Sequence, residues 1–148
     1  MTAPAPNSVH RIRLQGPWEW AVPTPHSTQA WTWNRVRLPD DWDRLPVIAG
    51  PVWFRRRFNT PTGITSTDRI HVAIPTTHRP IEVILNGQAL SALPQMLSEM
   101  TSMISCEITR VLTERNLLEI VFANGIRPPE IDGGMGRPVV LEIESTAA

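Results

Sequence analysis

Tryptophan is the residue type in this 148-residue sequence that most clearly offers binding chemistry. There are six tryptophans against three phenylalanines. An indole ring presents a large, rigid surface that can stack on the apolar face of a sugar ring. Trp20, Trp31 and Trp33 lie near the first long loop, where they are candidates both for ligand binding and for the core. The sequence therefore indicates an aromatic surface close to this loop.

Arginine supplies the polar candidates, because its planar guanidinium group can engage vicinal hydroxyls or a carboxylate. Arg79 lies in a turn between two expected strands, and Asp132 lies in a late loop before Gly133-Gly134. If loops from one end of the fold converge, the side chains of Arg79 and Asp132 share a rim. A solvated turn is the alternative interpretation for each. Arg55 and Arg57 are expected to pair with acidic residues on strands, such as Glu82 or Glu119.

The sequence contains no recognisable catalytic centre. It has no lysine and no tyrosine, which excludes Schiff-base chemistry, P-loop lysines and phenolic acids or nucleophiles. Glycoside hydrolysis needs two carboxyl groups about 5–10 Å apart, and the acidic residues here are scattered. The four histidines lack metal-binding spacing, so we expect neither a metal site nor a cofactor. Asp40, Asp41 and Asp43 crowd one turn, which we interpret as structural, with a calcium site as the alternative.

The charge balance and the absence of long apolar runs exclude further classes of protein. Fourteen basic and 14 acidic residues give a net charge of zero, which argues against a nucleic-acid partner. No segment approaches the ~18–20 apolar residues of a membrane span. The first residues lack a signal-peptide pattern, which predicts a cytoplasmic protein. Cys106 alternates with Ile104 and Ile108, so we expect its thiol to be buried.

Short segments with alternating apolar and polar residues must position these candidates. Residues 1–9 are expected to form a flexible arm, and residues 10–148 a single domain. Asn86-Gly87 is a strong signal for a two-residue hairpin. The pattern predicts an all-β fold, an antiparallel β-sandwich. The clearest expected strands cover residues 18–22, 31–38, 52–58, 69–74, 80–85, 117–122 and 138–143.

Two segments depart from the alternation of strands. Residues 108–113 are typical of a single helical turn before a strand. Roughly helical spacing is shown by Leu90, Leu93, Leu97, Met100 and Ile104, although Pro94 confines a helix to the later part. The Met-rich segment 93–103 is interpreted either as a hydrophobic surface for a protein partner or as a lid packed over one end of the sandwich.

Five motifs in order carry a resemblance to a known family. They are Gly16-Pro17-Trp18-Glu19-Trp20, Val36-Arg37-Leu38-Pro39-Asp40-Asp41-Trp42, Pro51-Val52-Trp53-Phe54-Arg55-Arg56-Arg57-Phe58, Ile81-Glu82-Val83-Ile84-Leu85-Asn86-Gly87, and Glu107 to Leu112 leading into Asn116-Leu117-Leu118-Glu119-Ile120. Over residues 14–144 the chain resembles the N-terminal sugar-binding domain of the family 2 glycoside hydrolases, the β-galactosidase and β-glucuronidase group. The resemblance implies a galactose-binding-like jelly roll. It also implies that Trp18, Trp42 and Trp53 are framework residues of the core.

The sequence departs from that family in two places. It ends at Ala148, without the immunoglobulin-like domain and catalytic barrel of family members, and residues 93–100 replace a glycine-rich, aromatic loop. We therefore expect a stand-alone, non-catalytic carbohydrate-binding module that holds a saccharide with loops at one end of the sandwich. The alternative is a structural or protein-interaction domain that assembles with itself or with another protein. Neither hypothesis involves nucleic acid or a membrane.

Overall fold

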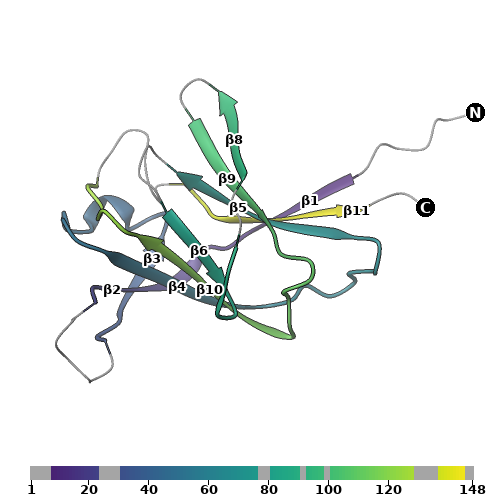
Figure 1. Ribbon diagram of the computed structural model, residues 1–148, viewed down its shortest axis with the longest axis horizontal. Coiled ribbons are helices and arrows are strands. Elements are labelled where there is room, and N and C mark those ends of the chain that lie inside the picture. Colours follow the sequence, from purple (N-terminus) through teal and green to yellow (C-terminus); the bar gives the residue numbers. More distant parts are fainter. Residues whose placement is uncertain are drawn as a thin grey trace, which may run out of the picture.

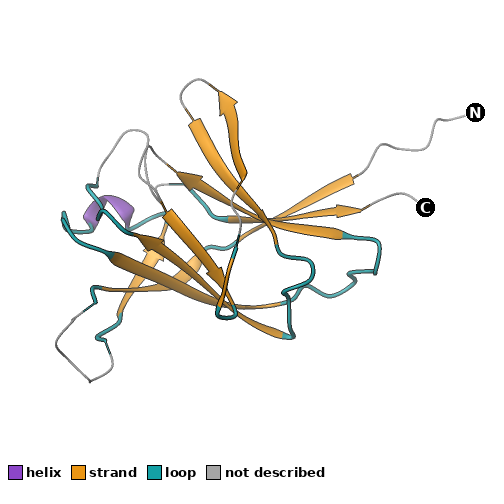
Figure 2. Ribbon diagram, viewed as in Figure 1, coloured by secondary structure: helices purple, strands orange, loops and turns teal. Residues whose placement is uncertain are grey.

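Two antiparallel β-sheets stacked as layers make up the fold (Figure 1). The structure, a computed structural model, describes residues 8–23, 31–76, 81–90, 93–98, 101–128 and 137–145. Within these ranges the helical element is the short 3-10 turn η1 (Trp42–Arg44), and the other elements are strands (Figure 2). No helix in the described part of the chain is long and apolar enough to cross a bilayer. The all-β sandwich predicted from the sequence is confirmed.

Eleven strands in the described ranges are divided between the two sheets. The five-stranded sheet has the order β1 (Ser8–Arg13), β11 (Val140–Ser145), β5 (Arg69–Thr76), β9 (Thr101–Glu107) and β8 (Leu93–Ser98). The six-stranded sheet has the order β3 (Asn34–Leu38), β2 (Gly16–Ala21), β4 (Val52–Asn59), β10 (Arg115–Phe122), β6 (Ile81–Leu85) and β7 (Gln88–Ala89). Most neighbours within a sheet are distant in sequence, so the chain crosses repeatedly between the layers.

The core lies between the sheets because successive side chains of a strand point to opposite faces. On β4, Val52, Phe54 and Phe58 point inward and are buried, whereas Trp53, Arg55 and Arg57 point outward. Arg56 lies on the inward side of the strand, where Nε donates to the carbonyl oxygen of Gln15 at 3.0 Å. Trp18 on β2 is fully buried, and its Nε1 donates a hydrogen bond of 2.9 Å to the carbonyl oxygen of Leu14. Other large core side chains are Trp42, Ile70, Ile74, Leu85, Ile108, Leu118, Ile120, Phe122 and Leu141.

Cys106 confirms the expected structural thiol. Its side chain on β9 is fully buried within the core. Burial penalises the thiolate and raises the pKa of Cys106 to about 11. A group that stays protonated at neutral pH is a poor nucleophile, so this thiol contributes packing.

The prediction of helical spacing after Leu90 was wrong, because residues 93–98 and 101–107 form the antiparallel hairpin β8–β9. In Figure 1 this hairpin extends beyond the neighbouring strands. Strand β9 also pairs with β5 along its length, and this long-range pairing overrides a local spacing that Pro94 had already weakened. Strand β1 was not predicted, and it begins at Ser8, within the segment expected to be an arm.

The expected turns are present. Asn86 and Gly87 both have positive φ, 53° and 81°, as a two-residue hairpin turn requires, and they connect β6 to β7. The amide N–H groups of Val111 and Leu112 both donate to the carbonyl oxygen of Ile108, which makes the predicted single helical turn before β10. Both elements follow from local chemistry, so the sequence was sufficient to find them.

Gly125 holds the loop after β10 against the loop before β4. Ile48 and Ile126 form an isolated bridge with two backbone hydrogen bonds of 2.9 and 3.0 Å. Gly125 has a φ of 84°, and a Cβ atom there would lie 2.0 Å from the carbonyl oxygen of Ile48. Only glycine allows this close approach.

Candidate functional site

Three tryptophans meet on the outer face of the six-stranded sheet, the face directed away from the core. Trp53 lies on β4 between the buried residues Val52 and Phe54, so its indole points outward. Trp31 and Trp33 precede β3, because the strand expected from residue 31 begins only at Asn34. All three indoles are half-buried, and we call them the tryptophan cluster.

The rings of the tryptophan cluster contact one another. The centroids of Trp31 and Trp53 are 5.2 Å apart with the planes at 64°, an edge-to-face arrangement. The centroids of Trp31 and Trp33 are 6.0 Å apart with the planes at 40°. Both distances lie in the range favoured by aromatic pairs, which gain about 0.5–1.5 kcal/mol beyond their burial. The cluster is therefore a connected aromatic surface.

The sheet beneath the cluster is built from smaller side chains. In the strand register, Trp53 on β4 lies between Ala21 on β2 and Val121 on β10. Both neighbours are buried although they point to the outer face. Their burial is consistent with indoles that lie across this end of the sheet.

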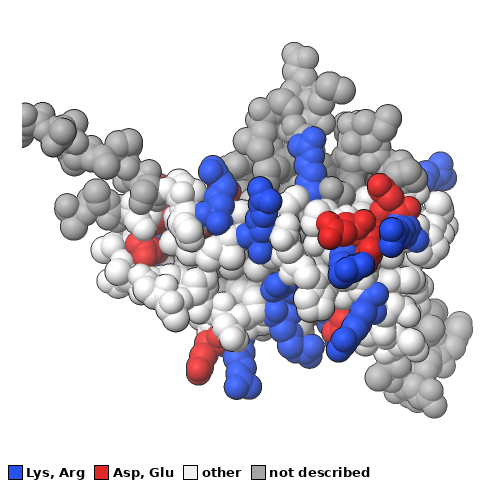
Figure 3. Space-filling view, turned by 180° about the vertical axis from the view of Figure 1, so that it is seen from behind, with Lys and Arg blue, Asp and Glu red and all other residues white. Residues whose placement is uncertain are grey.

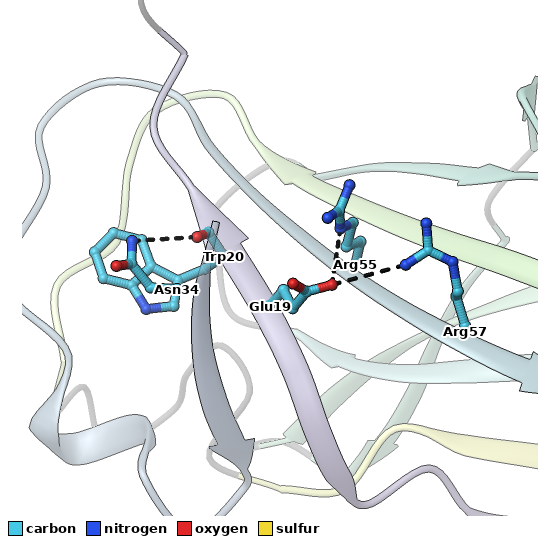
Figure 4. A network of polar contacts seen from close by, with 5 residues as sticks. All are labelled: Glu19, Trp20, Asn34, Arg55 and Arg57. Atoms are coloured by element: carbon cyan, nitrogen blue, oxygen red, sulfur yellow. Dashed lines mark hydrogen bonds and ion pairs between the residues drawn. The ribbon is translucent and has the colours of Figure 1, made fainter. Parts of the chain in front are cut away.

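A charged group borders the tryptophan cluster. The guanidinium carbon of Arg55 lies 3.7 Å from the centroid of the Trp33 ring, a cation–π contact. Nε of Arg55 also donates to Oε1 of Glu19 at 3.1 Å, and a terminal nitrogen of Arg57 lies 3.8 Å from the same oxygen. Figure 4 shows the Glu19 carboxylate reaching from β2 toward both arginines on β4. One carboxylate thus orients Arg55 over Trp33.

The tryptophan cluster, Glu19 and Arg55 combine the groups that recognise a polyhydroxylated ligand. Indole faces supply apolar contact, the guanidinium supplies donors in a fixed fork, and the carboxylate supplies acceptors. Half-exposed charged pairs add little to stability, typically ~0–1 kcal/mol. Among the described residues, no group of three His, Cys, Asp or Glu side chains could hold a metal ion.

Trp20, predicted beside Trp31 and Trp33, lies on the opposite face of the sheet. It pairs in register with Phe54 and Asn34, and its half-buried indole packs against the core. Asn34 Nδ2 contacts the backbone oxygen of Trp20 at 3.5 Å (Figure 4). Trp20 also borders a separate groove of about 410 Å³ near η1, which Arg44 also lines. The structure therefore separates Trp20 from Trp31 and Trp33, although the three were predicted to lie together.

The remaining predicted site residues, Arg79 and Asp132, lie outside the described residues.

The framework tryptophans Trp18 and Trp42 are in the core, with exposed fractions of 0% and 3%. The third framework prediction was wrong, because Trp53 belongs to the outer tryptophan cluster. Its neighbours Val52 and Phe54 occupy the inward positions of β4, so strand alternation forces Trp53 outward.

Glu19 and the role of Arg55 were not predicted from the sequence. The alternation of β4 could have placed Arg55 and Trp53 on one face, but it could not identify β2 as the neighbouring strand. The acidic partner of Arg55 and Arg57 is Glu19, rather than Glu82 or Glu119. Strand order is a tertiary property, and it decides which acid faces which arginine.

The aspartate turn has the structural role expected from the sequence. The Arg37 amide donates to Oδ2 of Asp41 at 3.0 Å, and the side chains of Arg37 and Arg44 lie 3.5 and 3.7 Å from the same carboxylate. The backbone hydrogen bond from Arg37 is the main cause that lowers the pKa of Asp41. Asp41 thereby fixes the turn that follows edge strand β3.

Surface charge elsewhere is mixed. In the view of Figure 3, arginines are spread over the surface, and acidic side chains lie among them, most of them toward one end. The face in this view therefore carries both signs of charge.

Comparison with known proteins yields structural similarity only. No protein-family model matches the sequence, and no curated protein matches it significantly. Among solved structures, a β-glucuronidase from Faecalibacterium prausnitzii superposes with a TM-score of 0.63 at 16% identity, covering 97% of this chain and 33% of its own. A putative β-galactosidase from Bacteroides fragilis gives 0.64 at 20% identity, covering 91% and 23%.

A third similar structure is that of a protein described as a member of glycosyl hydrolase family 2. A glycosyl hydrolase family 2 member from Bacteroides cellulosilyticus superposes with a TM-score of 0.62 at 14% identity, covering 90% of this chain and 20% of its own. The chain therefore spans between a fifth and a third of the length of these three proteins. It has the β-sandwich fold that these glycoside hydrolases contain as one part of a longer chain.

Proposed function

We propose that this chain is a non-catalytic carbohydrate-binding module whose binding surface is the tryptophan cluster. The observation that carries the proposal is the meeting of Trp31, Trp33 and Trp53 on the outer face, beside an oriented Arg55–Glu19 pair. Aromatic side chains that only fill a core would point inward, as Trp18 does. The similarity to enzymes that act on glycosides supports the ligand class.

In this proposal the residues of the site have different tasks. Arg55 covers one face of Trp33, so the remaining aromatic surface of the cluster receives the apolar face of a sugar ring. The free donors of Arg55 and the oxygens of Glu19 bind ring hydroxyls and fix the orientation of the sugar. Glu19 is engaged by two arginines, and we assign it this positioning role rather than a role in acid catalysis.

The second candidate function is a protein-interaction domain that uses the same surface. The aromatic area and the arginines that favour sugar binding are also typical of protein interfaces. The solved structures that share the fold are longer chains, in which this unit is one part. The cluster would then pack against another domain, another protein or a second copy of this chain. A cytoplasmic location stays a prediction under both candidates.

Glycan-array binding followed by titration calorimetry tests the proposal. We expect Trp31→Ala and Trp33→Ala to weaken saccharide binding roughly tenfold or more, as truncation of an aromatic anchor does. Val9→Ala is the matched control, because Val9 is an exposed apolar residue on the five-stranded sheet. Its affinity should equal that of the parent chain.

A clean negative across diverse glycans would contradict the carbohydrate proposal. Light scattering then tests the second candidate. A stable oligomer that dissociates in Trp31→Ala but persists in Val9→Ala would show that the cluster is an interface between copies of this chain.

A further inference from the structure

A second groove lies on the same outer face, at the other end of β4 and β10. It has a volume of about 430 Å³ and is lined by Arg57, Asn59, Asn86, Arg115 and Leu117, together with Phe58 and Asn116. Trp53 and Arg57 are four residues apart on one strand, a separation of about 13 Å. The groove is therefore a separate site on the face that carries the tryptophan cluster, and we call it the arginine groove.

The lining of the arginine groove is cationic. Arg57 and Arg115 both border it, and no acidic residue is among its described lining residues. Arg57 lies 3.8 Å from Glu19, whereas Arg55 is closer to the same oxygen at 3.1 Å. No ion pair is described for Arg115, whose side chain is exposed. Both guanidinium groups therefore have donors available for an incoming oxyanion.

The floor of the arginine groove is fixed by a network of two asparagines. Asn116 is 2% exposed, and its Nδ2 donates to Thr60 Oγ1 and to the carbonyl oxygen of Thr113, both at 3.0 Å. Asn86 donates from Nδ2 to Asn116 Oδ1 at 3.0 Å and accepts from the Leu117 amide at 2.9 Å. These amides are used within the fold, so they hold the groove in shape rather than bind a ligand.

The ligand-binding groups of the arginine groove are therefore Arg57, Arg115 and the exposed amide of Asn59. In the strand register, Arg115 lies opposite Asn59, and Leu117 lies opposite Arg57. Two guanidinium groups and an amide on a rigid floor match an anionic group with several oxygens, because each arginine can form two parallel hydrogen bonds to it.

We propose that the ligand is an acidic oligosaccharide, with a carboxylate or sulfate group in the arginine groove and a sugar ring on the tryptophan cluster. This inference rests on the proposed carbohydrate-binding function and names its ligand class. The chain of the saccharide would run along β4 from Trp53 toward Asn59. Apolar stacking at one end and charge-assisted hydrogen bonds at the other would let the saccharide bind in only one orientation along the strand.

Matched glycans test the inference. Oligosaccharides that contain uronic acids are compared with their carboxyl-reduced, neutral counterparts, and sulfated chains with their desulfated counterparts. We expect the acidic member of a pair to bind about tenfold more tightly at low salt, and added salt to reduce that advantage. Whether uronic or sulfated chains show the preference identifies the anionic group.

Arg115→Gln is the decisive variant, because Arg115 lies outside the tryptophan cluster. We expect it to remove the preference for acidic glycans, about tenfold in affinity, and to leave the binding of neutral glycans unchanged. Arg13→Gln is the matched control, since Arg13 is an exposed arginine on β1 of the other sheet. It should keep the full preference.

The failures of the two proposals differ. Equal affinity for acidic and neutral members, with both lost in Trp33→Ala, overturns the arginine groove and leaves the carbohydrate-binding function standing. An acidic preference that survives in Arg115→Gln also overturns the groove. Binding of no glycan at all overturns both.

Discussion

The two faces of the six-stranded sheet use the same kinds of residue in opposite ways. On the inner face, Trp18 is fully buried and its single polar atom donates to a backbone carbonyl. On the outer face, Trp33 is half-buried and its ring contacts the guanidinium group of Arg55. Both tryptophans lie at or next to strands that are neighbours in the sheet.

This contrast shows that the environment, rather than the residue type, decides the role of these side chains. Inner-face groups are enclosed by both sheets, so a change there leaves a cavity or an unpaired polar atom. The half-buried outer-face side chains of Trp33 and Arg55 keep contact with water, so a change there costs little stability and acts on binding. Stability and binding should therefore separate cleanly between the two faces.

The largest expected effect comes from comparing the two tryptophans directly. Trp18→Ala should lower the free energy of unfolding by about 3–5 kcal/mol, because it removes a large buried ring and leaves a cavity. Trp33→Ala should lower it by no more than about 1 kcal/mol and act mainly on ligand binding. Urea denaturation followed by circular dichroism measures both. Equal losses of stability would abolish the distinction between the faces.

The next effect compares two asparagines at the end of the β4–β10 pair. The side chain of Asn116, on the inner face, donates to Thr60 and to the backbone carbonyl oxygen of Thr113. It accepts from the backbone amide of Thr113 and from the side chain of Asn86. Asn116→Ala should cost about 2–3 kcal/mol, because several buried partners lose their hydrogen bonds together. Asn59→Ala on the outer face should stay within ~0.5 kcal/mol. A neutral Asn116→Ala would show that the network is dispensable.

The smallest effect, taken per pH unit, is a pH dependence that comes from the core side of the five-stranded sheet, where Cys106 lies on β9. Burial raises the pKa of Cys106 from 9.0 to about 11, so the folded chain retains a proton that the unfolded chain loses. The contribution to stability is present below pH 9 and is lost as the pH rises toward 11, with a slope of at most about 1.4 kcal/mol per pH unit. The sequence contains neither lysine nor tyrosine, which removes the usual side chains that titrate in this range.

Cys106→Ala is the control for that measurement. Urea denaturation at pH 8, 9, 10 and 11 should show a decline in the parent chain and a flatter profile in the variant. Parallel profiles would assign the alkaline dependence to other groups.

Strand β4 shows which features of the structure could be predicted from the sequence. The alternation of Val52, Trp53 and Phe54 was sufficient to predict β4, and it fixed which side chains share a face. The assignment of Trp53 to the core came from the family resemblance and was wrong, because the alternation directs its indole to the other face. The hairpin at Asn86-Gly87 and the turn after Ile108 were predicted for local reasons of backbone conformation.

Most of the strands, the turns at Asn86-Gly87 and after Ile108, and the all-β class could be predicted from the sequence alone, because each depends on residues that are close along the chain. The strand order β3-β2-β4-β10-β6-β7 is a property of the tertiary structure. That order joins Glu19 to Arg55 across 36 positions and Arg115 to Asn59 across the β4–β10 pair. Both candidate sites are built from side chains on neighbouring strands, and the pairing of distant strands is set by burial of the whole core rather than by any local signal.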